Sequence, residues 1–520
     1  MSAPPPTTQQ SPLREILQPF VDLFHAPRAL WGINLAYFIE GWVYFGMLGY
    51  LAMHFSDFIF EGVPNNDIHS HHMVMVLTAG ITISMFFLGS IADRKGIRRT
   101  LLTAFVFLLA GRIVMSAAPS VFPGTGLWSP LHLMTMGGIL LVVVGYGMYM
   151  PAAYAGVRKF TSPKTAAMGY AMLYALMNLG GWFPSFMSGV RHSVGITGAY
   201  WFYTSLTVLA LLATLFILTR KVELAAIARI EKENEQERLD AGRAVDTAEQ
   251  TAAKALEAFD PDRRVPPHLW ATLLAIAASI YFLPATARVA VWGAMAAAVA
   301  VLVLYRRWGL PAYRWLANHP LADAKFFFFI FALIPVQTLF TYNWLVLPQY
   351  FERAFTGVVS NRFELFSNLN PILIFIAVPI VTALTQKKKI YNMMMLGTFV
   401  MAAPAFLLAL GTNMWLVLSF LFITTMGEAM WQPRFLQYAA EIAPEGRTGA
   451  YMGVAQFPWF LTKMLVPLYS GAMIQKYCPA EGPQAPQTMW LYYAMIAMVS
   501  TVLLVAAKGW AGKDFKAKAA

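Results

Sequence analysis

The sequence predicts an all-α membrane protein that crosses the bilayer many times. Three observations support this prediction. Hydrophobic residues make up 58% of the 520 residues and charged residues only 12%, a balance that is unusual for a soluble domain. Apolar segments of the length that spans a bilayer core recur along most of the chain. Polar or basic loops separate them, so the lipid bilayer is the expected surrounding of this protein.

Fourteen membrane spans are predicted, as two sets of six with an inserted pair between them. They cover residues 29–54, 73–91, 100–118, 131–155, 165–188, 197–219, 268–284, 287–305, 325–348, 366–385, 390–410, 413–437, 448–473 and 489–508. The segment before the inserted pair is rich in Ala, Glu, Lys and Arg, which favours a helical linker. An alternative treats the pair as two further helices of one continuous bundle.

The predicted organisation follows from these spans. It comprises a cytoplasmic N-terminal tail (1–28), an N-terminal six-helix bundle (29–219), a cytoplasmic helical linker (220–267), an inserted transmembrane hairpin (268–305), a cytoplasmic connection (306–324), a C-terminal six-helix bundle (325–509) and a basic cytoplasmic tail (510–520). Two bundles of equal helix number are expected of a transporter built from two structural repeats.

Basic residues gather in short loops that fall on one side of the predicted spans. These loops cover residues 94–99, 158–164, 387–389 and 508–518. Cytoplasmic loops carry such an excess of Lys and Arg, so both termini are predicted to be cytoplasmic, in a cell inner membrane. The same placement argues that the formal charge of +12 reflects topology and that nucleic acid is not a partner.

The sequence gives no sign of an enzyme or a cofactor. Cys478 is the single cysteine, which excludes an internal disulfide and metal ligands with CxxC spacing. No nucleotide-binding loop or nucleophile elbow is present. His69, His71 and His72 precede the second span, so we expect them in a solvated external loop rather than around a metal ion. A monomer without cofactor is expected.

The loop after the second span, GSIADRKGIRR at residues 89–99, has a distinctive spacing of Gly, Asp and Arg. It resembles the signature cytoplasmic loop of the major facilitator superfamily. The resemblance implies the major facilitator fold and a conformational latch that stabilises the outward-facing state. The predicted latch residues are Gly89, Asp93, Arg94, Gly96, Arg98 and Arg99.

Motifs in both halves resemble one branch of that superfamily, the proton-dependent oligopeptide transporters, which also insert two helices between their halves. The matching segments are EGWVYFGM (40–47), GYGMYMP (145–151), LYALMNLGGW (173–182), SNLNPILIFIAVPIV (367–381) and GEAMWQPRFLQYAAEIAPEGRTGAYMG (427–453). Because they are spread over both halves, a chance match to one apolar motif does not explain them.

The chain departs from that family where the family binds a peptide carboxylate. Gly41 stands in place of the first-helix Arg, Tyr37 in place of a Glu, and Met150 in place of the fourth-helix Lys. The seventh-helix Glu-Gln pair falls on Val336 and Gln337, so its Glu is also missing. By the resemblance, the residues that hold the carboxyl end of a peptide are lost.

The residues that hold the amino end of a peptide are retained. By the resemblance these are Asn178, Asn370 and Glu428. Further side chains are expected to line the substrate cavity, namely Tyr37, Tyr44, Gln337 and Lys463. A peptide-like or cationic, amine-bearing solute is therefore the expected substrate.

Several charges lie inside predicted spans, where an acidic or basic residue costs about 2.5 to 3.5 kcal/mol to insert. Glu40 is expected to have no partner and, together with Glu428, to bind and release the protons that drive transport. The alternative that remains open is a fixed ion pair, for instance between Glu428 and Lys463. Arg112 is expected to serve as an interhelical anchor.

The sequence as a whole predicts a secondary active transporter, not an enzyme, that moves a small polar solute by alternating access. Proton coupling is expected, so protons are a second partner. One alternative is a facilitator or exchanger that works without protons. The other is a membrane sensor or lipid-handling protein that does not transport.

Overall fold

The computed structural model describes residues 27–88, 91–161, 163–241, 260, 262–279, 292–293, 295–297, 299–300, 303–304, 306–385, 388–444 and 448–512. Within these residues all regular secondary structure is helical, as predicted. Nine helical stretches of this described part are long and apolar enough to cross a membrane, from Arg28–Ile59 to Pro486–Ala511. The protein is a multi-pass, all-α membrane protein.

The helices follow each other in two groups with shorter elements between them. The first group comprises α2 (Arg28–His54), the π-helical turn η1 (Phe55–Ile59), α3 (Asn66–Leu88), α4 (Ile91–Lys95), α5 (Ile97–Val121), α6 (Pro130–Phe160), α7 (Pro163–Trp182), the 3₁₀ turn η2 (Phe183–Phe186) and α8 (Ser188–Ile217). Between the groups lie α9 (Arg220–Ala241), α11 (Pro267–Ser279), α13 (Arg306–Ala317) and η4 (Pro320–Ala322). The second group comprises α14 (Ala324–Ala332), α15 (Ile334–Leu345), α16 (Leu347–Ala354), α17 (Val358–Asn361), α18 (Phe363–Ser367), α19 (Leu369–Thr385), α20 (Ile390–Ala402), α21 (Ala405–Leu408), α22 (Met414–Ile442), α23 (Thr448–Val454), α24 (Phe457–Tyr477) and α25 (Pro486–Ala511).

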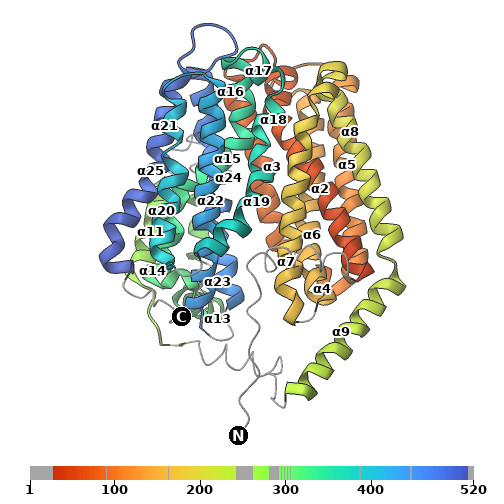
Figure 1. Cartoon of the computed structure of the whole chain (residues 1–520), viewed down its shortest axis with the longest axis vertical. Helices are drawn as coiled ribbons and strands as arrows, with labels where there is room; N and C mark the ends of the chain where they lie inside the picture. Colours follow the sequence, from red (N-terminus) through yellow and green to blue (C-terminus); the bar gives the residue numbers. More distant parts are fainter. Residues whose placement is uncertain are drawn as a thin grey trace.

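The two groups stand side by side (Figure 1). Figure 1 shows α16, α17 and α18 at one end of the molecule, which is called the α16 end below. The short basic helix α4 and the helices α9 and α13 lie at the opposite end, called the α9 end. The predicted tails (1–28 and 510–520) and the predicted hairpin turn fall largely or wholly outside the described residues.

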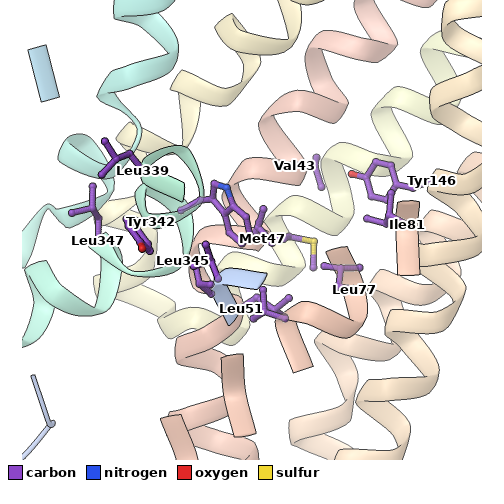
Figure 2. Close-up of a cluster of buried hydrophobic side chains, with 14 of the residues drawn as sticks. Val43, Met47, Leu51, Leu77, Ile81, Tyr146, Leu339, Tyr342, Leu345 and Leu347 are labelled. Carbon is purple, nitrogen blue, oxygen red and sulfur yellow. The ribbon is translucent and has the colours of Figure 1, made fainter. Parts of the chain in front are cut away.

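The groups meet along a long apolar interface. Helix α3 contacts α24, α7 contacts α19, and α2 contacts both α15 and α16. Figure 2 shows the centre of this interface, where side chains of α2 lie between those of α3 and α6 on one side and those of α15 on the other. The labelled residues are Val43, Met47, Leu51, Leu77, Ile81, Tyr146, Leu339, Tyr342, Leu345 and Leu347. Helix α2 therefore packs against helices of its own group and of the second group.

The predicted span 325–348 is not one continuous helix. It is divided into α14, α15 and the start of α16, and the breaks lie at Leu333 and Val346. Pro335 and Pro348 follow these breaks in the first turns of the next helices. Proline has no backbone N–H and is tolerated in the first turn of a helix, so each one begins a new segment here. Gln349 and Arg353 of α16 contact α3 of the first group.

Helices α2 and α7 cross at a pair of glycines. A Cβ atom on Gly41 would lie 2.7 Å from the backbone oxygen of Met177, and one on Gly180 would lie 2.2 Å from that of Phe38. Real Cβ atoms do not approach backbone so closely, and small residues allow helices in membranes to pack at short range. The glycines therefore permit this crossing, which fixes α7 against the helix that contacts both groups.

Gly41→Ala is expected to destabilise the protein because the added methyl group must push α7 away from α2. Overpacking of this kind costs about 1 to 3 kcal/mol. Gly49→Ala on the same helix is the matched control, since a Cβ there meets no described atom within 4 Å. Thermal unfolding of the purified protein in detergent measures both. Equal melting temperatures for the two variants would show that the crossing is not tight.

Candidate functional site

Glu428 and Asn370 form a buried polar pair within the second group. Asn370 of α19 donates one hydrogen bond to Oε2 of Glu428 at 2.9 Å and another to Thr425 at 3.0 Å, both residues of α22. Glu428 is 3% exposed, and no cation pairs with it in the part of the chain that the structure describes. The sequence predicted both residues for one site, and the structure brings them together.

Lys463 does not reach Glu428. Its Nζ atom lies 4.3 Å from the centre of the Trp459 ring, and both residues belong to α24. Trp459 also packs edge-on against Phe340 of α15. The alternative of a fixed Glu428–Lys463 ion pair is therefore wrong for this conformation. A lysine held against an aromatic ring gains a cation–π attraction instead.

Gln337 lies on α15, one turn before Phe340, and is buried. Its Oε1 atom finds no hydrogen-bond partner among the described residues. A buried amide oxygen without a donor loses about 1 to 3 kcal/mol, so such an atom commonly faces a site that a ligand or water fills. Gln337 stays a predicted substrate-lining residue.

Asn178 is half-buried on α7 and is not bonded to Asn370 or Glu428. Its side chain donates to the backbone oxygen of Tyr174 at 2.9 Å. Tyr174 interacts electrostatically with Glu428, although the two lie in different groups. Helix α7 contacts α19, so the predicted amine site spans the interface between the groups.

Tyr37 and Tyr44 are packed into an aromatic cluster within the first group. The Tyr37 hydroxyl contacts the sulfur of Met150 at 3.2 Å, and its ring stacks on Tyr149 with the centroids 5.7 Å apart. Tyr44 packs edge-on against Tyr146 at 5.2 Å. The two tyrosines therefore serve mainly as packing residues here, and neither is hydrogen-bonded to the other predicted site residues.

Glu40 has a partner, so the expectation that it is unpaired was wrong. Arg112 of α5 binds both of its carboxylate oxygens, one of them at 2.9 Å, and the Tyr146 hydroxyl of α6 donates to Oε1. Arg112 also donates to Thr207 of α8 at 2.7 Å. Both charged side chains are at most 1% exposed. The residues come from four helices that are distant in sequence, which is why their pairing could not be foreseen.

This cluster has the character of an anchor. A bidentate carboxylate–guanidinium pair is geometrically rigid, and it joins α2, α5, α6 and α8 of one group. Arg112 was expected to be an interhelical anchor, and its contacts agree with that role. Because Glu40 is already compensated, it is a poorer candidate for proton transfer than Glu428.

Ion pairs cross between the two groups at the α16 end. Arg353 of α16 binds both oxygens of Asp67 of α3, each at 2.8 Å. Arg191 of α8 binds Oε1 of Glu364 of α18 at 2.5 Å. These four residues were not predicted. They lie just beside the predicted spans, where charges are common, so only their spatial pairing marks them out.

His71 joins this set of contacts. Helix α3 begins at Asn66, and His71 is fully buried, with one ring nitrogen 2.8 Å from Gln349 of α16 and the other 2.7 Å from Ser470 of α24. The expectation of a solvated loop at this histidine was therefore wrong. Polar partners from the second group lie opposite the helix start, and the sequence near His71 contains no sign of them.

The predicted latch lies at the α9 end. Gly96 has a φ of 84°, which a glycine adopts easily, and it precedes α5. The backbone N–H of Arg98 donates to Glu223 of α9 at 3.2 Å, so this carboxylate caps the positive end of α5. Arg94 and Arg99 are exposed, whereas Gly89 and the side chain of Asp93 lie outside the described residues. Glu223 was missed, although an acid early in the linker helix was a usable signal.

Comparison with known proteins identifies the family. A sequence model described as Major Facilitator Superfamily matches residues 30–467. The chain belongs to the major facilitator superfamily. An uncharacterized MFS-type transporter of Bacillus subtilis (strain 168), YttB, is 25% identical over 179 residues, which cover 33% of this chain. The match spans 44% of the length of that relative.

Solved structures show the same fold. A POT family transporter, PepTSo, has a TM-score of 0.64 at 15% identity and covers 94% of this chain and 99% of its own. A peptide transporter POT in complex with sulfate has a TM-score of 0.63 at 18% identity and covers 94% of this chain and 95% of its own. A POT family transporter in complex with 5-aminolevulinic acid has a TM-score of 0.57 at 16% identity, covering 94% and 97%. At these identities the likeness shows the fold alone.

The structure gives the departures at Gly41 and Met150 a physical basis. An Arg at position 41 has no room beside Met177, because even a Cβ atom is too close to its backbone. Met150 accepts the Tyr37 hydroxyl where the resemblance places a Lys. Superfamily members are transporters rather than enzymes, in agreement with the prediction.

Glu40→Gln is expected to lower the free energy of unfolding by about 3 to 5 kcal/mol, since it leaves a buried Arg112 without its counter-charge. Replacing both partners, as Glu40→Gln with Arg112→Gln, should recover much of that loss. Arg229→Gln provides a control, because its pair with Glu233 on α9 is exposed and worth less than about 1 kcal/mol. Melting temperatures in detergent test this, and a neutral Glu40→Gln would contradict the anchor.

Stability is expected to fall with rising pH through Glu352 of α16. Burial raises the pKa of this carboxyl from 4.5 to about 7; Asp57 adds to the effect and Arg191 opposes it. The folded state therefore favours the protonated form. Its contribution is complete below pH 4.5 and is lost as the pH rises through about 7. Glu352→Gln should flatten this part of a melting-temperature profile, whereas the exposed Glu61→Gln should retain the slope.

Proposed function

We propose that the protein is a secondary active transporter that carries a small, amine-bearing or cationic polar solute by alternating access. One observation carries this proposal: Glu428 is buried, is hydrogen-bonded to Asn370 and has no cation beside it among the described residues. The fold and family support transport in general. The solute class and the coupling ion are inferred from the residues.

An uncompensated carboxylate inside a membrane protein is costly, and such residues commonly mark ion or substrate pathways. Two mobile cations can compensate Glu428: a proton or the ammonium group of a solute. Alternation between them gives a physical route to coupling, because a proton must leave before the solute amine pairs with the carboxylate. The contact between α7, which carries Asn178, and α19, which carries Asn370, supports a site shared by both groups.

The solute is expected to lack a free carboxylate that needs a cationic partner. Positions 41 and 150, which hold Arg and Lys in the peptide carriers that the sequence resembles, are occupied by Gly and Met. Burying a carboxylate without a counter-charge costs several kcal/mol. Lys463 of α24 is the alternative cation that the sequence predicts for the substrate site, and its ammonium lies against the Trp459 ring.

The contacts at the α16 end support alternating access. Two ion pairs and the His71 bridge join the groups there, so their rupture separates the groups at that end only. We infer that the α16 end faces the outside of an inner membrane and that the basic α9 end faces the cytoplasm. The conformation is then closed to the outside. We expect the monomer to be the transporting unit.

A second candidate is an exchanger or facilitator that works without protons. The observation that favours it is the pairing of Glu40, which removes one of the two acids expected to carry protons. Glu428 alone then decides between the two candidates.

Proteoliposomes that contain an internal pH dye test the proposal with a panel of ethanolamine, agmatine and dialanine. Under an imposed outward-directed proton gradient, a transported amine added outside should enter as protons leave, because the proton and the amine occupy Glu428 in turn, and dialanine should compete weakly. Glu428→Gln should abolish solute-linked proton movement and weaken amine binding by about tenfold or more. Glu441→Gln, an exposed acid on the same helix, is the matched control. Amine flux that does not depend on the pH gradient supports the proton-independent exchanger or facilitator. Absence of flux with every solute of the panel contradicts transport of small amines.

A further inference from the structure

A pocket lies between the two groups near the α16 end, away from Glu428. It is lined by Phe45, Gly46, Gly49, Tyr50, Pro184, Trp344, Pro348, Phe363, Glu364, Ser367 and Asn368. Four of these residues are aromatic and come from α2, α15 and α18. Glu364 is the only charged side chain among these lining residues.

Two polar atoms of this pocket are buried and unpartnered. Glu364 is 2% exposed and Ser367 is 8% exposed, yet Oε2 of Glu364 and Oγ of Ser367 find no hydrogen-bond partner in the described part of the chain. The other oxygen of Glu364 accepts from the Tyr50 hydroxyl at 2.8 Å and from Arg191 at 2.5 Å. Half of a buried carboxylate is therefore open to a further donor, and such unmet capacity is costly unless something binds.

Arg191 shows what this wall accepts. The carbon at the centre of its guanidinium group lies 4.6 Å from the centre of the Phe363 ring, and its Nε atom is bonded to Glu364. An aromatic face together with a carboxylate is a binding arrangement for organic cations. Arg191 belongs to α8 of the first group, whereas Glu364 and Phe363 belong to α18 of the second. When the groups separate at this end, Arg191 leaves with the first group, whereas Glu364, Phe363, Ser367 and Trp344 stay together on the second.

The other ion pair at the α16 end differs from this one. Asp67 accepts from Arg353 through both oxygens, at 2.8 Å each, and Oδ1 also accepts from Gln349 at 3.2 Å. Both oxygens of Asp67 are thus occupied, and neither Asp67 nor Arg353 lines the pocket. The contrast separates an ion pair that only joins the groups from one that borders a cavity with open bonding capacity.

We propose that Glu364, Ser367 and the rings of Phe363, Tyr50 and Trp344 form a second cation site, which Arg191 occupies as a tethered substitute while the α16 end is closed. The site takes an ammonium or guanidinium group of a small organic cation. It rests on the proposed function for its place on a transport path, since it would receive the solute before Glu428 does. Binding of a cation at this site does not depend on transport and can be measured without it.

Binding of methylguanidinium to the purified full-length protein tests the site, with sodium chloride at equal ionic strength as the reference. Calorimetric titration and the shift in melting temperature are the two readouts. Arg191→Ala removes the tethered competitor and should raise methylguanidinium affinity about tenfold or more over the wild type. Arg353→Ala is the matched control, because it breaks the other intergroup pair and should leave the affinity at the wild-type value.

Two additional changes, each made in the Arg191→Ala protein, locate the bound cation. Glu364→Gln removes the carboxylate and should abolish the gain. Gly49→Leu should also abolish it, because a Cβ at Gly49 enters open space on the pocket wall and leaves Glu364 unchanged. If Arg191→Ala does not fold, Arg191→Gln repeats the series.

Equal affinities for Arg191→Ala and Arg353→Ala would overturn the proposal, as would a gain that survives Glu364→Gln. Glu428→Gln in the Arg191→Ala protein should leave the gain intact, which separates this site from the proposed transport site. A protein that transports amines but shows no gain in Arg191→Ala retains the proposed function and loses the second site. A gain in methylguanidinium affinity in a protein that transports no amine retains the second site and contradicts the proposed function.

Discussion

A charge buried within a membrane protein needs a counter-charge, and the position of that counter-charge determines which parts of this fold are able to move. Glu40 and Arg112 satisfy each other inside the first group, at a junction of four helices. Separating them would expose both charges to an apolar interior, which costs several kcal/mol. The first group is therefore expected to move as one body, with α2 carrying its contacts to the second group along with it.

The pairs that cross between the groups have the opposite property. Asp67–Arg353 and Arg191–Glu364 lie at the end of the molecule, where water can replace each partner once the groups part. Their rupture is correspondingly cheaper than rupture of a pair in the centre of a bundle. The same chemistry thus stabilises one group internally and holds the two groups together reversibly. Only the location of each pair differs.

Glu428 is the exception among the buried acids described here, because its one direct polar contact is the neutral amide of Asn370. The proposed transport mechanism uses this property, because a mobile cation rather than the protein then compensates the carboxylate. The proposed cation site at Glu364 resembles Glu428 in this respect: its carboxylate is compensated by Arg191, a cation that leaves when the groups separate.

The sequence by itself determined the all-α membrane fold. Apolar segments of bilayer length and basic loops are local features of the sequence, so they can be recognised without knowing which residues contact each other. Motifs in two helices also predicted that Asn370 and Glu428 belong to one site, and the structure shows the two side chains hydrogen-bonded. Only the tertiary structure decided that Glu40 is paired, that Lys463 is not paired with Glu428, and that His71 is buried. Glu40 and His71 are bonded to residues of other helices, far away in sequence, and Lys463 lies against a ring of its own helix. The local sequence around a charged residue or a histidine does not show which distant side chains the fold brings beside it.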